Sequence, residues 1–264
     1  MKEKSLSRKH FFIDLFVVLL LPVLAYFLTI YLTLSFLVSI LLFFVVPLAY
    51  LLVRDRHLIK KALLSALVTV PATVIIDYFA MKDKAWYDST VLPFRILNDI
   101  SLEDFFWFGA WFAYIVVFYA YFVDKRPTNE EKISRRYASL LKGWFTAVII
   151  FFLLYIFMEE YLYIPYFYLF FTVIIGIVPM LWILSKRHSF VYKFSKVATY
   201  FFGLNFLHEL SAQKTHQWVF PGDNFVGWVT VAGISFPIEE LLMFMMLGSF
   251  FVLCWYEYFI DDFR

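Results

Sequence analysis

Residues 11–53 read FFIDLFVVLLLPVLAYFLTIYLTLSFLVSILLFFVVPLAYLLV, and Asp14 is the only charged residue in this run of 43. A helix needs about 20 mostly apolar residues to cross the hydrocarbon core of a bilayer, so the run is long enough for two crossings. The whole chain has 264 residues, of which 63% are hydrophobic and 17% are charged. Soluble domains average about 45–50% apolar and about 25% charged residues. We therefore expect an all-α integral membrane protein.

Further apolar segments downstream bring the expected number of spanning helices to about eight. The expected spans are residues 11–31, 32–53, 60–81, 103–123, 141–159, 161–184, 194–210 and 238–258. With a cytoplasmic N-terminus, only four of the 23 Lys and Arg residues fall on the outer side, namely Lys82, Lys84, Arg95 and Lys214. Loops rich in Lys and Arg stay in the cytoplasm. We therefore expect a multi-pass protein of the cell membrane with both termini cytoplasmic.

The net charge and the numbers of cysteines and glycines limit which cofactors and partners are expected. A net charge of +2 gives no reason to expect a nucleic-acid partner. The single cysteine, Cys254, excludes an internal disulfide framework and a multi-cysteine metal site. The chain has eight glycines and no Gly-rich phosphate-binding loop. We expect no nucleotide, flavin or metal cofactor.

An internal repeat organises the chain. Its landmarks in the first half are His57, Asp77, Trp86, Glu103 and Asp124, with spacings of 20, 9, 17 and 21 residues. Those in the second half are His188, Glu209, Trp218, Glu239 and Asp261, with spacings of 21, 9, 21 and 22 residues. The pattern predicts two parallel four-helix repeats, residues 1–123 and 141–264, joined by a cytoplasmic linker over 124–140. Sites in such proteins lie at the interface of the repeats.

Two pairs of adjacent acids begin the last span of each expected repeat. The second repeat has Pro237-Ile238-Glu239-Glu240, and the first has Ser101-Leu102-Glu103-Asp104. Acids also stabilise helix N-termini through the helix dipole, which is the simpler explanation for one such pair. Because the pair recurs in apolar surroundings, where carboxyl pKa values shift, we predict that both pairs are functional.

Single acids near the outer ends of two spans form a second candidate group. Asp77 and Glu209 lie at equivalent repeat positions, where the helix dipole and burial both disfavour the charged form of a carboxyl. The acids of the outer loops are expected to form a solvated rim. These are Asp83, Asp88, Asp99 and Asp223.

The sequence resembles the membrane-integral, flavin-independent lycopene cyclases. The resemblance rests on Asp77 followed by Trp86-Tyr87, and on Pro237-Ile238-Glu239-Glu240 with Phe244, over residues 55 to 260. Ser101 replaces the motif proline in the first repeat, and Glu209 stands where that repeat has Asp77. The resemblance implies a lycopene β-cyclase that closes β-ionone rings. The implied catalytic residues are Glu239, Glu240, Glu103, Asp104, Asp77 and Glu209. The implied substrate-binding residues are Trp86, Tyr87, Phe105, Trp107, Trp218, Pro237 and Phe244.

The residues themselves suit this chemistry. Ring closure needs a carboxylic acid, a carboxylate base, a dry pocket and aromatic faces that stabilise a cation, and it involves no net redox change. The expected substrate is lycopene or a related linear carotenoid that enters from membrane lipid. A second copy of the chain and other carotenoid-pathway enzymes are candidate partners. Two alternatives stay open: a non-catalytic carotenoid- or lipid-binding membrane protein, and a prenyltransferase-like lipid enzyme that requires magnesium.

Overall fold

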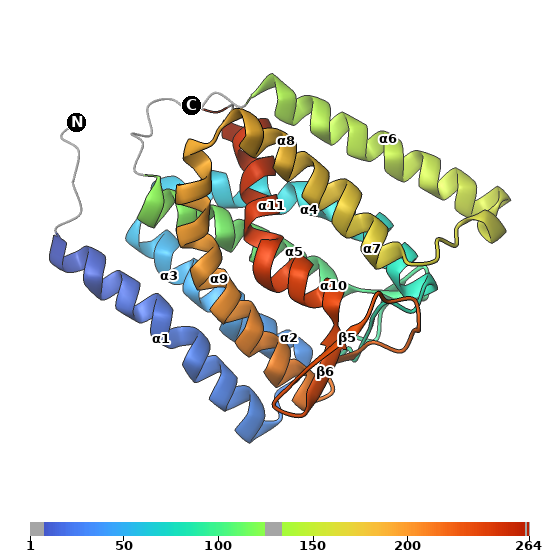
Figure 1. Cartoon of the computed structure of the whole chain (residues 1–264), viewed down its shortest axis with the longest axis horizontal. Helices are drawn as coiled ribbons and strands as arrows, with labels where there is room; N and C mark the ends of the chain where they lie inside the picture. Colours follow the sequence, from blue (N-terminus) through green and yellow to red (C-terminus); the bar gives the residue numbers. More distant parts are fainter. Residues whose placement is uncertain (1–7, 125–133, 262, 264) are drawn as a thin grey trace.

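The computed structural model describes residues 8–124, 134–261 and 263, and it is an all-α membrane protein with 77% of its residues helical. Figure 1 shows long helices that run side by side, with the short strands gathered at one end of the bundle. Seven helical segments are long and apolar enough to cross a membrane. An eighth long helix, α9 (Ser189–Lys214), occupies the position of the expected span 194–210. The structure thus confirms the expected helices.

The first half contributes four helical segments and three short strands. These are α1 (Arg8–Leu32); α2 (Phe36–Ile40), η1 (Leu41–Val45) and α3 (Val46–Arg54); η2 (Arg56–Leu58) and α4 (Ile59–Lys82); β1 (Tyr87–Asp88), β2 (Arg95–Ile96) and β3 (Ile100–Ser101); and α5 (Leu102–Phe118) with η3 (Tyr119–Val123). The label η marks a π-helical or 3₁₀ turn.

The second half has the same order. Its elements are α6 (Arg135–Phe157) and η4 (Glu159–Tyr161); α7 (Phe167–Phe171), η5 (Thr172–Ile177) and α8 (Val178–Lys186); α9; β4 (Trp218–Val219), β5 (Trp228–Val231) and β6 (Ile234–Pro237); and α10 (Ile238–Glu240), η6 (Leu241–Leu247), α11 (Gly248–Trp255) and η7 (Tyr256–Asp261). In both halves the second span contains a π-helical turn followed by a Val-Pro pair, and the last span ends in another π-helical turn.

The two repeats are interlocked. The first helix of each repeat packs against the third helix of the other, α1 against α9 and α6 against α4. Helices α1 and α6 lie on opposite flanks of the bundle in Figure 1. Strands β1 and β4 pair antiparallel, with Tyr87 opposite Val219 and Asp88 opposite Trp218. Because Trp86-Tyr87 and Trp218-Val219 are equivalent in the sequence repeat, this ladder joins equivalent positions of the two halves.

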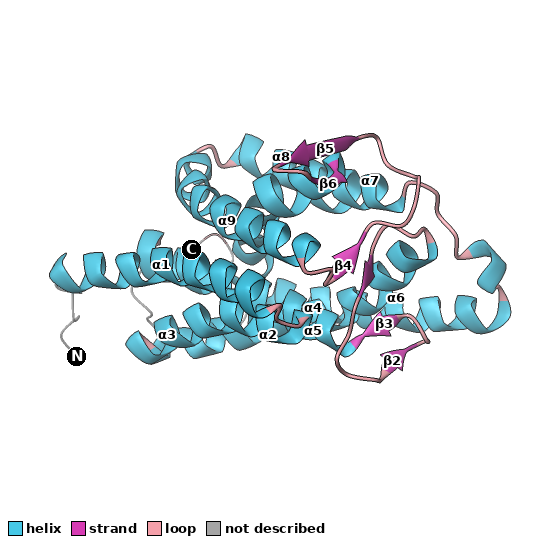
Figure 2. Ribbon diagram, turned by 90° about the horizontal axis from the view of Figure 1, so that it is seen from below, coloured by secondary structure: helices cyan, strands magenta, loops and turns pink. Residues whose placement is uncertain are grey.

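Some details differ from the sequence-based expectation. The three two-stranded sheets of the described residues, whose strands are magenta in Figure 2, were not predicted. Helix α6 begins at Arg135, inside the expected linker over 124–140. This earlier start was not predicted, because the first turns of the helix are polar and resemble a linker in sequence. Residues 125–133 of that linker lie outside the described residues.

A buried carboxylate joins three segments of the first repeat. Asp14 of α1 is 0% exposed and accepts hydrogen bonds from Tyr50 (2.6 Å) and Arg54 (2.9 Å) of α3 and from Tyr121 of η3. The partners satisfy the only charge of the long apolar run, which would otherwise be costly to bury. Asp14 therefore anchors α1 to its own repeat while the rest of that helix packs on α9.

Replacing Asp14 by Leu should destabilise the protein. The leucine has a similar size but leaves Arg54 and both tyrosine hydroxyls without their acceptor, so we expect a loss of about 1–3 kcal/mol in the free energy of unfolding. Thermal denaturation in detergent micelles measures it. Glu160→Gln, at an exposed position, is the control and should melt with the wild type. An unchanged melting temperature for Asp14→Leu would show that the anchor is dispensable.

Candidate functional site

A cavity of about 450 Å³ of empty space lies near the strand end of the bundle. This figure includes the space at the mouth of the cavity that is open to solvent. Residues of both repeats line the cavity, and every one of them is either aromatic or acidic. The aromatic residues are Phe36, Trp86, Trp107, Phe108, Trp218, Phe220 and Phe244, and the acidic residues are Asp77, Asp88, Asp104 and Glu240.

Seven of the thirteen residues predicted for the site line this cavity. They are Asp77, Asp104, Glu240, Trp86, Trp107, Trp218 and Phe244. Two of the aromatic candidates lie elsewhere. Tyr87 is 49% exposed and its ring lies under the Arg95 guanidinium, 4.9 Å from ring centroid to Cζ. Phe105 packs on a separate apolar cluster around Tyr78 and Ile100.

The acid pair of the first repeat has a divided role. Glu103 Oε1 accepts the backbone N–H groups of Val91 (2.8 Å) and Leu92 (2.9 Å), and so holds the loop after β1. Asp104, the next residue, lines the cavity. The Ser101 hydroxyl donates to Asp104 Oδ2 at 2.8 Å, and it also caps the helix by accepting the Asp104 N–H at 3.2 Å. Adjacent helix positions point about 100° apart, which lets one acid hold the loop while the other faces the cavity.

The second repeat divides its acids in the same way. Pro237 precedes the first turn of α10, where its missing N–H costs nothing. Glu239 Oε1 accepts the Val226 backbone N–H at 2.8 Å and holds the loop before β5. Glu240 lines the cavity and accepts a hydrogen bond from the Tyr168 hydroxyl. The structure therefore places Glu103 and Glu239 beside the cavity as loop ligands, and Asp104 and Glu240 in its wall.

The single acids of the long helices, Asp77 and Glu209, are buried close to these pairs. Asp77 is 0% exposed, and neither of its carboxylate oxygens has a hydrogen-bond partner among the described residues. Glu209 accepts a hydrogen bond from Trp218 Nε1 at 3.2 Å, and its carboxyl group interacts electrostatically with that of Glu240. The second repeat thus holds two interacting acids, of which Glu240 lines the cavity.

The expectation of a solvated acidic rim was wrong for two of its four members. Asp83 is 4% exposed and accepts the Phe167 backbone N–H (2.9 Å) and the Asn224 amide (2.7 Å). Asp88 is 2% exposed and lines the cavity. Asp83 is buried by its contacts with Phe167 and Asn224, and Asp88 lies in the β1–β4 ladder beside the cavity.

Sequence reasoning also missed three aromatic walls of the cavity and the tyrosine that contacts Glu240. These residues are Phe36, Phe108, Phe220 and Tyr168. The sequence does contain a spacing that marks two of these residues as equivalent. Phe36 and Tyr168 each stand 11 residues before the proline of the second span, Pro47 and Pro179.

Among the acids of the cavity, Asp88 is the one whose burial gives a pH-dependent effect on the stability of the fold. Burial raises the pKa of the Asp88 carboxyl, and the Arg95 guanidinium, 3.7 Å away, offsets only part of this effect. A carboxyl whose pKa is raised on folding favours the folded state below its unfolded pKa of about 3.9 and loses this advantage as pH rises through its folded pKa.

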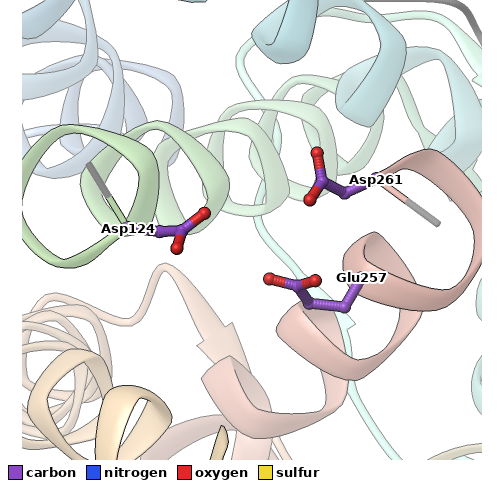
Figure 3. A group of neighbouring side chains, drawn as sticks. All are labelled: Asp124, Glu257 and Asp261. Atoms are coloured by element: carbon purple, nitrogen blue, oxygen red, sulfur yellow. The ribbon is translucent and has the colours of Figure 1, made fainter. Parts of the chain in front are cut away.

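A second acidic group lies among the helix ends remote from the strands. Figure 3 shows Asp124, Glu257 and Asp261 pointing toward one another, with carboxylate oxygens within 4.8 Å. Lys193 Nζ lies 2.9 Å from Asp124, and the Tyr119 hydroxyl donates to Glu257 at 2.7 Å. Asp124 and Asp261 are equivalent landmarks of the repeat, so this group joins the inner ends of the two halves. The positive charge of Lys193 offsets part of the negative charge of the three acids, so this group is explained as a structural ion cluster.

Asp88→Asn should stabilise the protein increasingly as pH rises. The neutral amide avoids the cost of ionising a buried carboxyl, so the difference in melting temperature between variant and wild type should grow from pH 4 to pH 8. Thermal melting in detergent at several pH values measures it. The exposed Asp223→Asn is the matched control and should follow the wild type throughout. A variant that melts below the wild type at pH 8 would contradict the argument.

Comparison with protein-family models, with curated proteins and with solved structures finds no match to this chain.

Proposed function

We propose that this protein is a lycopene cyclase of the membrane-integral type, which closes the ends of lycopene or a related linear carotenoid to β-ionone rings. One observation carries the proposal: a single cavity, shared by both repeats, combines four carboxyl groups with seven aromatic side chains. The resemblance in sequence points to the same activity.

The reaction uses the groups that this cavity offers. A carboxyl proton moves to a terminal double bond, and a neighbouring double bond attacks the resulting tertiary cation to form the ring bond. A carboxylate then removes a ring proton, and a double bond is restored. Atoms and electrons balance without an oxidant or reductant. Aromatic faces lower the energy of the cationic intermediates, and a dry cavity protects them from water.

Glu240 and Asp104 are the proposed acid–base pair, because each lines the cavity from the start of its helix. Asp77 lines the same cavity, and Glu209 contacts Glu240. Glu103 and Glu239 support the reaction indirectly by holding the loops beside the cavity.

The alternatives fit less well. A prenyltransferase must hold a diphosphate with a divalent cation or basic side chains, whereas the described lining of this cavity contains four acids and no Lys, Arg or His. Within the described chain, the only group of three acids with ligand atoms mutually within 4.8 Å is the Asp124 group at the opposite end. A carotenoid-binding protein without activity needs the aromatic walls but gives no reason to bury four carboxyl groups, which are costly in an apolar environment.

The proposed location is the cell membrane, with both termini in the cytoplasm. Under this orientation the strands and the cavity lie toward the outer face. The substrate would reach the cavity laterally from the bilayer, since a carotenoid is insoluble in water.

Glu240→Gln should abolish ring formation while the protein still folds. The amide keeps the size of the side chain but cannot transfer a proton, and losing an acid–base group costs about 10²–10⁴-fold in rate. The test is expression in a lycopene-accumulating bacterium, followed by pigment chromatography. Glu160→Gln, far from the cavity lining, is the control and should convert lycopene like the wild type. Normal conversion by Glu240→Gln at equal expression would refute this assignment.

Turnover should require neither flavin, nicotinamide nucleotide nor divalent metal. The reaction has no net redox change, and the sequence lacks a Gly-rich loop for a nucleotide. The measurement is lycopene conversion by purified, flavin-stripped protein in liposomes with and without chelator. Complete loss of activity in chelator would favour the magnesium-dependent alternative instead.

A further inference from the structure

The two repeats differ by one hydroxyl group at a pair of equivalent positions beside the cavity. Phe36 packs edge-on against Trp218 of the other repeat, with ring centroids 5.4 Å apart and an interplanar angle of 74°. Tyr168 packs in the same way against Trp86, at 5.2 Å and 76°. These matching contacts, together with the shared spacing to the proline, make Phe36 and Tyr168 counterparts. They differ only in the phenolic oxygen of Tyr168.

That hydroxyl contacts the acid of the cavity wall. Tyr168 is 0% exposed, and it donates a hydrogen bond to Glu240. In the first repeat, the hydroxyl on the equivalent acid, Asp104, comes from Ser101. The residue equivalent to Ser101 in the second repeat is Pro237, which has no side-chain donor. The hydroxyl donor to the cavity acid therefore comes from the start of the same helix in the first repeat, and from a different span in the second repeat.

The new donor constrains the acid in a different way. Ser101 lies on the same helix start as Asp104 and moves with it. Tyr168 belongs to α7, so its hydrogen bond fixes the Glu240 carboxyl relative to a separate cavity wall. Its ring also contacts Phe244, with centroids 6.0 Å apart. A π-helical turn, η6, begins directly after Glu240, where α5 of the first repeat stays regular; such turns are frequent at functional sites.

We propose that Tyr168 is a positioning residue that holds the Glu240 carboxyl in place for proton transfer. The inference rests on the proposed cyclase function. It explains why the two halves keep similar walls but differ in the side chains that hold their acids.

Tyr168→Phe tests the proposal, because it places at this position the phenylalanine that the first repeat has at Phe36. Misplacement of a reacting group by about 1 Å can cost about 100-fold in rate. We expect kcat for lycopene in liposomes to fall about 10-fold or more, with KM within about twofold, because the apolar walls that bind the substrate are unchanged. Tyr119→Phe is the matched control. It removes a hydroxyl from another buried tyrosine–glutamate pair, Tyr119 and Glu257, at the inner end of the bundle, and should leave kcat within about twofold.

A second readout does not depend on turnover. Infrared difference spectra of wild type and Glu240→Gln identify the carboxyl bands of Glu240, and these bands should shift in Tyr168→Phe but not in Tyr119→Phe. Equal kcat and equal bands for Tyr168→Phe and wild type would overturn the positioning role. Equal losses of kcat in both tyrosine variants would also overturn it, because they would indicate a general effect on packing. Wild-type protein that does not convert lycopene would refute the proposed function itself, whereas the infrared bands would still report on the contact between Tyr168 and Glu240.

Discussion

The burial of carboxyl groups in an apolar interior is the constraint on which this structure depends. A charged acid at the centre of a membrane helix costs at least about 2.5 kcal/mol, so an acid that is buried in the charged form needs donors. The fold meets this requirement at two sites by placing two acids in succession at a helix start. Glu103 and Glu239 accept backbone N–H groups of the adjoining loops, and this leaves Asp104 and Glu240 for the cavity. The loops at the strand end are therefore held by the same motif that supplies two of the cavity acids.

The contacts between the two halves explain why the cavity is shared. Helix α1 packs against α9 and α6 packs against α4, so each half supports a helix of the other. At the strand end the β1–β4 ladder joins the halves, and at the opposite end the carboxylates of Asp124 and Asp261 lie close together. The cavity lies beside the β1–β4 ladder. Each repeat therefore supplies one cavity-lining acid from the start of its last span, and each supplies aromatic walls.

Much of this could be predicted from the sequence, and the failures have a local cause. Apolar runs are sufficient to find the spans, and the spacing of charged landmarks is sufficient to find the repeat. The strand β1 was not predicted, because two residues carry too little periodic signal and their partner lies in the other repeat. Alternate residues of a strand face opposite sides. Trp86 and Asp88 consequently face the cavity while Tyr87 is exposed. This explains why the candidate Tyr87 does not line the cavity and why Asp88 was not among the predicted site residues.

The places where the repeat has lost its symmetry are themselves informative. The two junctions keep equivalent landmarks, namely Trp86 and Trp218 at the β1–β4 ladder, and Asp124 and Asp261 at the opposite end of the bundle. The halves differ at positions in and beside the cavity, which include Ser101 against Pro237, Phe36 against Tyr168, and Asp104 against Glu240. A duplicated fold with two identical acids would present the same group on both sides of a substrate. In the proposed reaction, proton donation and proton removal occur at different atoms, so a cavity whose two acids differ in length and in hydrogen-bond donors suits it better.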